Sequence, residues 1–361
     1  MSDRKLRVVV LCGGTSPEHE VSLATGRTVA SAFDRTKYDV QTVTIAKDGQ
    51  WLLPNIAWPP LDAAESNGNL VPAAFDVERA IEQMKRARAA DVVFIALHGA
   101  GGEDGTIQGL LECAGIPYTG SGVLASALAM DKVRSAQLFT ASGLRVPKFQ
   151  TITRSSPFSI SHETEKGFRA ASEEIDFPRV VKPSNCGSSV GVSIVRSADQ
   201  LDAALQQAFV HGDTALVQEY IAGTEVTCAV LDDGEPIALP PTEIVPKSAT
   251  FFDYGAKYTP GASEEITPPR LPPDVIHQIQ STALQAHRIL GCFGMSRTDM
   301  ISAVDGGIVV LETNTIPGMT ETSLLPQAAA AAGIPFPALL DRLIHAALAR
   351  ARSTAIAQPT R

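Results

Sequence analysis

An apolar run within the stretch from Lys5 to Cys12 (KLRVVVLC), unbroken from Val8, does most to limit what this chain can fold into. A strand with one solvated face alternates apolar and polar residues, whereas a strand buried on both faces of a parallel sheet is apolar nearly throughout. The run is followed by Gly13-Gly14-Thr15-Ser16 and then by a helical pattern from His19 to Phe33. This order of strand, turn and helix predicts an α/β domain.

The glycine-rich turn after this strand has two interpretations. A helix N-terminus behind such a turn can bind an anion such as phosphate, but two glycines alone are equally compatible with a simple tight turn. Glu18 argues against phosphate, because its carboxylate would repel that anion and attract an ammonium group instead.

Two further strands, Tyr38–Ala46 and Asp91–Leu97, are expected in the same domain, with a helix over 77–90 between them. The second strand ends at His98, which a glycine-rich loop follows. Ligands of open α/β sheets bind at the carboxyl ends of strands. We therefore interpret His98 as a site residue, although a lone histidine is more often structural, and we predict one doubly wound domain over the first ~120 residues.

Length, charge and cysteine pattern narrow the class of protein. A chain of 361 residues is expected to form about two or three domains. The formal charge of −9 argues against a nucleic-acid partner, because no basic field would release counterions. No apolar run approaches the ~20 residues that span a bilayer, and the N-terminus lacks the apolar segment of a signal peptide. Five cysteines without CxxC spacing favour free thiols and a cytoplasmic setting.

Hard-ligand residues lie at the end of a predicted hairpin near the C-terminus. The apolar run Ile308–Leu311 is typical of a strand, and it is followed by Glu312 and Asn314, whose side chains leave one face of an extended chain. Arg297 and Asp299 have the same spacing on the preceding strand, predicted over 296–304. Carboxylate and amide oxygens without His or Cys are the ligands that Mg²⁺ selects, and an adjacent arginine suits phosphate or an oxyanion.

The turn after this hairpin supplies a backbone donor. Pro317-Gly318 redirects the chain, and Gly318 can bring an N–H group close to a ligand because it has no side chain.

A second glycine-rich loop, with a lysine on the strand before it, predicts a phosphate site. Lys182 lies on a strand predicted over Phe177–Pro183, and the loop Ser184–Gly191 can offer several backbone N–H groups to phosphate. A mobile hairpin turn would explain the glycines but not the lysine. The loop is not a Walker A loop, because no Gly-Lys-Ser/Thr opens a helix. Lys132, on a helix predicted over Val123–Ser142, is by itself most simply a solvated lysine.

Strands predicted over Thr214–Ile221 and Val226–Leu231 could line a purine pocket beside this loop. Glu225 could then accept hydrogen bonds from ribose hydroxyls, although alone it would be assigned to the surface. The stretch Lys247–Pro273 is irregular and is either disordered or functional. Its aromatic residues, with the pair Lys257-Tyr258, favour a lid, because disordered linkers are poor in aromatics.

The rest of the chain is predicted to be helical, apart from the hairpin. Helices are expected over Asp274–Leu290, Ser323–Ala332 and Pro337–Arg350, and the last ten residues are expected to be frayed.

Seven strings in this order resemble the motifs of D-alanine–D-alanine ligases, which are members of the ATP-grasp superfamily: GGTSPEHEVS (13–22), ALHGAGGEDGTIQG (96–109), GSGVLASALAMDK (120–132), VKPSNCGSSVGVS (181–193), FFDYGAKY (251–258), SRTD (296–299) and ETNTIPGMTETSL (312–324). The resemblance implies a three-domain ATP-grasp fold of the α/β class, α+β in part. An N-terminal α/β domain over 1–121 would precede a central ATP-grasp subdomain with the phosphate loop over 122–218 and a C-terminal ATP-grasp subdomain with the lid and the Mg²⁺ site over 219–361. The first of these would contain a doubly wound parallel sheet.

The resemblance also implies a function. Two D-alanines would be joined through a D-alanyl phosphate at the cost of ATP, with two Mg²⁺ ions (or Mn²⁺) as cofactors, in cytoplasmic synthesis of peptidoglycan precursors. The residues that match the family's nucleotide contacts are Lys132, Lys182, Ser188, Ser189, Gln218, Glu219 and Glu225. Asp299, Glu312 and Asn314 match its metal ligands. The family commonly forms homodimers.

The matches at the reacting centre are residue by residue. Glu18 matches the carboxylate that holds the first D-alanine's ammonium group, in a triad with Ser188 and Tyr258, while Lys257 and Tyr258 would close with the lid. Arg297 and the N–H of Gly318 match the oxyanion hole. The residues that match further substrate contacts are His98, Ser323 and Leu324.

Two residues depart from the family pattern, and three other functions stay open. Gln218 stands where many members have Glu, and Cys186 lies inside the phosphate loop without an evident role. The second substrate could be D-lactate or D-serine, although Tyr258 after Lys257 favours D-alanine. Another ATP-grasp carboxylate–amine ligase would not need Glu18, Ser188 and Tyr258 together. A silent ATP-binding protein would not need the metal ligands with Arg297.

Overall fold

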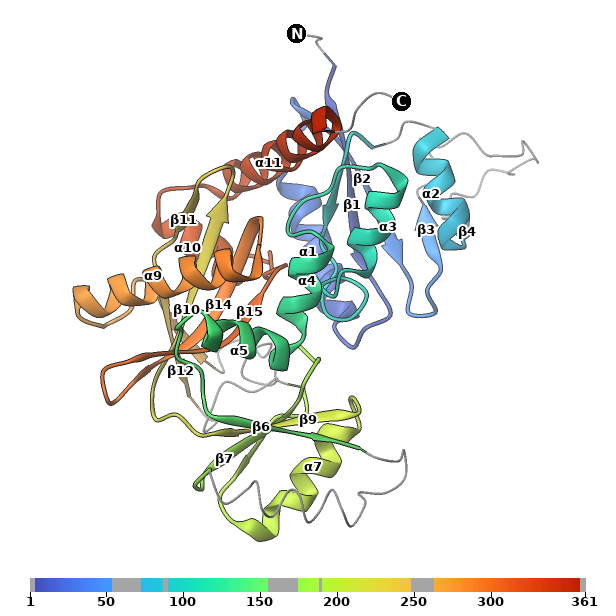
Figure 1. Ribbon diagram of the computed structural model, residues 1–361. Helices are drawn as coiled ribbons and strands as arrows, with labels where there is room; N and C mark the ends of the chain where they lie inside the picture. The colour runs from blue at the N-terminus through green and yellow to red at the C-terminus, as the bar shows by residue number, and fades with distance from the viewer. Residues whose placement is uncertain are drawn as a thin grey trace.

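We describe the protein from a computed structural model, which describes residues 4–53, 73–86, 90–154, 175–187, 190–247 and 263–357. Three sheets organise these residues (Figure 1). The predicted lid pair Lys257-Tyr258 and the loop serines Ser188 and Ser189 lie outside the described residues.

The first sheet has the strand order β4-β3-β2-β1-β5. Three adjacent strands are parallel, β2 (Tyr38–Ile45), β1 (Leu6–Gly13) and β5 (Val92–Ile95), with β5 last in the strand order, which confirms the prediction from the apolar run. The two further strands, β3 (Trp51–Leu53) and β4 (Ala73–Phe75), are antiparallel, so the sheet is mixed rather than wholly parallel.

Four helices pack around this sheet or at its ends: α1 (His19–Ala32), α2 (Val77–Arg86), α3 (Thr106–Ala114) and the long α11 (Phe336–Ala357). The core under them joins Val9 and Ile95 to Leu340 and Ile344 of α11, all at most 1% exposed. The C-terminal helix therefore completes the core of the first sheet. Because it continues to Ala357, the expectation that the last ten residues are frayed is wrong for 352–357.

The second sheet has the order β13-β12-β10-β14-β15, with β11 paired to β10. Its members are β10 (Gly223–Asp232), β11 (Pro236–Ala238), β12 (Thr242–Pro246), β13 (Ser263–Ile266), β14 (Gly294–Ala303) and β15 (Ile308–Asn314). The helix α9 (Pro273–Leu290) packs on β10, β14 and β15. The strand β13 lies inside the stretch that we expected to be irregular.

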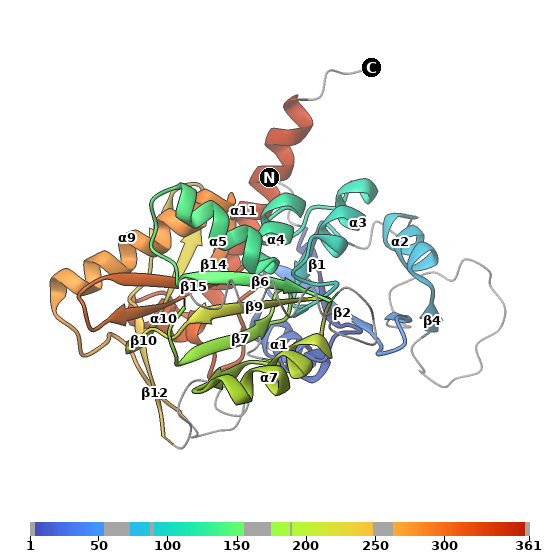
Figure 2. The same ribbon diagram turned by 60° about the horizontal axis from the view of Figure 1, so that its bottom comes forward.

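The third sheet is antiparallel, with the order β6-β9-β7-β8. It comprises β6 (Phe149–Thr153), β9 (Thr214–Glu219), β7 (Arg179–Pro183) and β8 (Ser193–Val195). The helix α7 (Leu201–Phe209), after a short 3-10 turn (Ala198–Gln200), packs on β7 and β9 (Figure 2).

One stretch that we predicted to be a single helix forms two helices. The expected helix over Val123–Ser142 is divided into α4 (Val123–Met130) and α5 (Lys132–Ala141). Asp131 between them has an extended backbone, and its side chain accepts hydrogen bonds from two N–H groups of the first turn of α5. A short carboxylate in this position is a strong N-cap, so it starts a second helix and turns Lys132 toward the interior.

The last helix in chain order before α11 is α10 (Leu324–Ala331), which Ser323 precedes. None of the helices in the described ranges is long and apolar enough to cross a bilayer. All five cysteines lie in those ranges as free thiols.

Candidate active site

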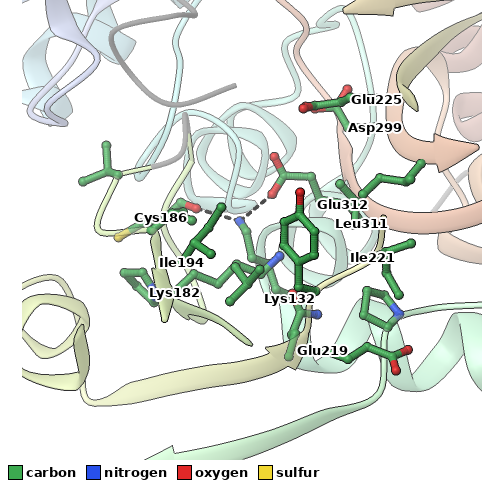
Figure 3. A pocket seen from close by; sticks show the side chains of 18 residues that line it. Lys132, Lys182, Cys186, Ile194, Glu219, Ile221, Glu225, Asp299, Leu311 and Glu312 are labelled. Atoms are coloured by element: carbon green, nitrogen blue, oxygen red, sulfur yellow. Dashed lines mark hydrogen bonds and ion pairs between the residues drawn. The ribbon is translucent and has the colours of Figure 1, made fainter. Parts of the chain in front are cut away.

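A pocket lies between the third sheet and the β14–β15 hairpin (Figure 3). Its walls are apolar, with Val180 and Ile194 from one sheet and Ile301 and Leu311 from the other. Polar groups are few and come from several elements: Lys132, Lys182, Gln218, Glu219, Glu225, Asp299 and Glu312. An apolar slot with convergent polar side chains suits a purine nucleotide. The structure thus brings together all the described residues that match nucleotide contacts.

Lys132 is the buried link between the two sides of this pocket. Its Nζ donates a 2.6 Å hydrogen bond to the carbonyl of Cys186 in the phosphate loop and lies 3.0 Å from Oε2 of Glu312 (Figure 3). Burial lowers the pKa of Lys132, but the charge and hydrogen bond of Glu312 outweigh it, so the pKa is raised and the ammonium stays charged. The interpretation of Lys132 as a solvated lysine is therefore wrong, because only 8% of it is exposed.

The remaining nucleotide candidates lie on neighbouring strands. Lys182 is buried at the end of β7, and Gln218 is buried on β9, opposite Val180. Glu219 accepts a hydrogen bond from the backbone N–H of Lys148 at 3.0 Å. Gln218 and Glu219 therefore lie where β9 leaves the sheet, at the edge of the apolar slot.

The two pairs of hard-ligand residues face each other across β14 and β15. Asp299 is directly opposite Glu312, and Arg297 is opposite Asn314, with a register shift immediately after Asp299. Arg297 donates two bonds of 2.8 Å to the two carboxylate oxygens of Asp299. Asn314 Nδ2 donates to Asp299 Oδ2 at 3.2 Å.

This arrangement fits Mg²⁺ by the chemistry of its donors. Asp299 and Glu312 present carboxylate oxygens from adjacent strands, and Asn314 adds an amide group beside them. Within the described residues no three side chains of His, Cys, Asp or Glu are grouped as a metal site. Thr227, which the sequence did not indicate, donates a 2.6 Å hydrogen bond to Asp299 and orients that carboxylate.

Glu18 is held between two glycine-rich loops. A Cβ on Gly99 would lie 2.4 Å from Oε2 of Glu18, and a Cβ on Gly187 of the phosphate loop would lie 2.9 Å from the same atom. A methyl group at either position would push the Glu18 carboxylate aside, and the positive φ of Gly99 also favours glycine there. The carboxylate is therefore in contact with the phosphate loop, one residue before Ser188.

His98 is buried beside Glu18. Its Nε2 is hydrogen-bonded to Thr25 Oγ1 at 2.8 Å, and its carbonyl accepts from Ser16 Oγ at 2.8 Å. Burial lowers the pKa of His98, although the charge of Glu18 and a backbone hydrogen bond with Ile316 oppose the shift. The imidazole ring of His98 is therefore neutral at physiological pH.

The sequence analysis missed Glu103, which lies five residues after His98. Its carboxylate accepts hydrogen bonds from the N–H groups of Gly99 and Ile316, at 2.9 and 3.1 Å. Burial and then the charge of Glu18 raise the pKa of Glu103 to about 8. The side chain keeps intermediate exposure because it lines a small cavity beside Asn314. The sequence could have indicated Glu103, because it lies in the GEDG segment (102–105) of the string ALHGAGGEDGTIQG, which resembles a family motif.

Gly318 and Ser323 lie together in the turn after β15. A Cβ on Gly318 would be 2.8 Å from Ser323 Oγ. Thr320, another residue without a sequence signal, donates its N–H to Ser323 Oγ at 2.9 Å, and the two hydroxyls are 2.7 Å apart. Leu324 follows as the first residue of α10.

Comparison with known proteins covers nearly the whole chain. Residues 7–121 match a family described as "D-ala D-ala ligase N-terminus", and residues 138–345 match "D-ala D-ala ligase C-terminus". A D-alanine–D-alanine ligase from Syntrophobacter fumaroxidans is 46% identical over 350 residues, which are 96% of this chain and 99% of that protein.

Solved structures of ligases are also similar to this chain over nearly its whole length. A VanG D-Ala:D-Ser ligase from Enterococcus faecalis is 34% identical with a TM-score of 0.79, over 95% of this chain and 100% of that one. A D-alanine–D-alanine ligase from Bacillus anthracis complexed with ATP is 32% identical with a TM-score of 0.74, over 97% of this chain and 99% of that one.

Proposed function

The chain belongs to the D-alanine–D-alanine ligase family, and we propose that it joins two D-alanines into D-alanyl-D-alanine while ATP is converted to ADP and phosphate. The observation that carries this proposal is the contact between the Glu18 carboxylate and Gly187 of the phosphate loop. A carboxylate that can hold an ammonium group thereby lies beside the backbone that can hold a terminal phosphate. An amino acid bound there has its own carboxylate close to the phosphoryl group.

ATP would bind in the pocket of Figure 3. The adenine would lie between the apolar walls near Gln218 and Glu219, the ribose near Glu225, and the phosphates near Lys132 and Lys182. Asp299, Glu312 and Asn314 would hold two Mg²⁺ ions, which offset the charge of the transferred phosphoryl group. Ser188 and Ser189 would add donors from the loop.

In the first step a carboxylate oxygen of D-alanine attacks the γ-phosphorus, and the bond from that phosphorus to ADP breaks. Glu18 holds the ammonium group of this D-alanine, and the neutral His98 lies next to it. The raised pKa of Lys132 keeps a positive charge beside the phosphates throughout. The product is D-alanyl phosphate.

In the second step the uncharged amine of another D-alanine attacks the acyl carbon, phosphate leaves, and the nitrogen loses one proton as the amide forms. Arg297, which Asp299 orients through two hydrogen bonds, and the N–H of Gly318 stabilise the oxyanion of the tetrahedral intermediate. Ser323 holds the carboxylate of the second D-alanine, with Leu324 beside it. A lid that carries Lys257 and Tyr258 would exclude water from the acyl phosphate.

A ligation assay with ATP, Mg²⁺ and either D-alanine, D-serine or D-lactate as the second substrate tests this proposal. We expect D-alanyl-D-alanine to be the main product at neutral pH, with stoichiometric release of phosphate. The similarity to a D-Ala:D-Ser ligase makes D-serine the informative competitor. Preferential formation of the D-serine or D-lactate product would refute the choice of D-alanine, and no phosphate release would refute the ligase activity.

The proposal also covers the domain boundaries, the oligomeric state and the cellular location of the protein. We place domain boundaries near residues 121 and 218, and we expect a homodimer in the cytoplasm. The free thiols support a reducing compartment. Light scattering of the purified protein would test the dimer.

A further inference from the structure

The loop between β5 and α3 carries a carboxylate that binds backbone groups from two distant parts of the chain. Glu103 Oε2 accepts the N–H of Gly99 at 2.9 Å, and Oε1 accepts the N–H of Ile316 at 3.1 Å, from a residue 213 positions away. Gly99 adjoins the carboxylate of Glu18, and Ile316 lies two residues before Gly318. Glu103 therefore bridges the loop of the first substrate and the turn that carries the oxyanion donor.

The turn after β15 also packs on the core of the first sheet through the side chain of Ile316. Ile316 is 3% exposed and belongs to the apolar core that contains Ile95 and Leu97. Apolar packing is not directional, so it holds the turn near the sheet without fixing where its N–H groups point. Hydrogen bonds to the two oxygens of one carboxylate supply that direction.

We propose that Glu103 is a positioning residue for the second step of the reaction: its bond to Ile316 sets the N–H of Gly318 relative to the acyl group held near Glu18. The proposal rests on the proposed function. An oxyanion donor must lie within hydrogen-bond distance of an atom that becomes charged only in the tetrahedral intermediate. A small displacement of the turn therefore slows the second step and leaves phosphoryl transfer almost unchanged.

Asp104 is a matched control for Glu103. It is the next residue, and its carboxylate also accepts two backbone N–H groups, from Gly101 at 2.7 Å and Thr106 at 2.9 Å. Both partners of Asp104 lie within three residues of it, in the loop and at the first residue of α3, so Asp104→Asn removes a similar carboxylate without affecting the distant turn. In Glu103→Gln one oxygen becomes an NH₂ group, which cannot accept a hydrogen bond from a backbone N–H.

The test separates the two steps by isotope scrambling in ATP labelled with ¹⁸O at the bridge between the β- and γ-phosphates. When the γ-phosphoryl group moves to D-alanine and returns, the β-phosphate of ADP can rotate, and the label leaves the bridge. The ratio of scrambling to dipeptide formation therefore reports how often the acyl phosphate reverts instead of reacting with the amine.

In Glu103→Gln we expect dipeptide formation to fall about 10- to 100-fold, since an error of about 1 Å at a reacting centre can cost that much. The ratio of scrambling to dipeptide should rise at least about tenfold, with the KM for ATP within about threefold of wild type. Asp104→Asn should keep the wild-type ratio. Equal losses of scrambling and dipeptide in Glu103→Gln would overturn the proposal.

If Glu103→Gln does not fold, Glu103→Asp replaces it. The shorter side chain keeps the carboxyl group but cannot span both N–H groups, so the same rise in the ratio is expected, and an unchanged ratio refutes the role of Glu103. Wild-type protein that forms no dipeptide would instead refute the proposed function, so the two failures are distinguishable.

Discussion

Replacing Gly99 by alanine tests the geometry around Glu18. Gly99 has a φ of +71°, and a methyl group there would lie 2.4 Å from Glu18 Oε2, whereas ordinary contact begins near 3.4 Å. The carboxylate must therefore retreat by about 1 Å. Since an error of that size can cost about 100-fold in rate, we expect Gly99→Ala to lower kcat/KM for D-alanine by about that factor.

Gly101→Ala separates this effect from backbone strain. Gly101 has a similar φ of +81°, but nothing lies within 4 Å of a Cβ at that position. Both variants should lose about 1–2 kcal/mol of stability, because L-residues are disfavoured at positive φ. Only Gly99→Ala displaces Glu18.

The assay is the initial rate of dipeptide formation at low D-alanine and saturating ATP, together with urea unfolding of each variant. We expect Gly101→Ala to stay within about threefold of wild type in kcat/KM, with a stability loss no larger than that of Gly99→Ala, whose Cβ would also lie 3.2 Å from Ser16 Oγ. If the two variants lose activity equally, the contact with Glu18 is irrelevant and the reasoning is refuted.

Three further predictions concern the hairpin and the core. Arg297→Ala should raise the activation free energy of turnover by about 2.7–4 kcal/mol, as expected for an oxyanion donor. The affinity for ATP, measured by calorimetry, should change much less. A comparable loss of ATP affinity would assign Arg297 to phosphate binding instead. Glu312→Gln removes the carboxylate partner of the buried Lys132 and should destabilise the metal-free protein by about 3–5 kcal/mol in urea unfolding; a loss below about 1 kcal/mol would contradict a buried pair. Burial lowers the pKa of His287 although Asp232 opposes it, so its contribution to stability is present above the unfolded pKa of about 6.5 and is lost as the pH falls below it. Wild type should therefore lose more stability than His287→Gln between pH 7.5 and pH 5.5, and parallel pH profiles would show that His287 is not responsible.

Most helices and strands could be predicted because their signals are local. The apolar run of β1 and the periodic pattern of α9 depend on residues a few positions apart. The break at Asp131 was missed, because the apolar pattern of α4 continues into α5 and masks the capping residue between them. The new helix start at this carboxylate accompanies the burial of Lys132, which by itself was most simply interpreted as a solvated lysine.

The hairpin shows where prediction of the site stopped. A spacing of two residues predicted that Arg297 and Asp299 share a face, and likewise Glu312 and Asn314. The spacing contains no information on register, so the pairing of Asp299 with Glu312 came from the structure. The strand continues through Glu312 to Asn314, in agreement with the extended chain that this spacing assumed.

By itself, the sequence determined the chemistry that each segment could supply: hard oxygen ligands, a lysine-flanked loop, and a carboxylate where a phosphate site was first considered. Only the tertiary structure decided which of these groups meet. Gly187 and Gly99 contact Glu18 from two different loops, and Glu103 reaches Ile316 across 213 residues. Such contacts depend on how sheets and loops pack against one another, and the residues that make them are too far apart in sequence for any local pattern to indicate them.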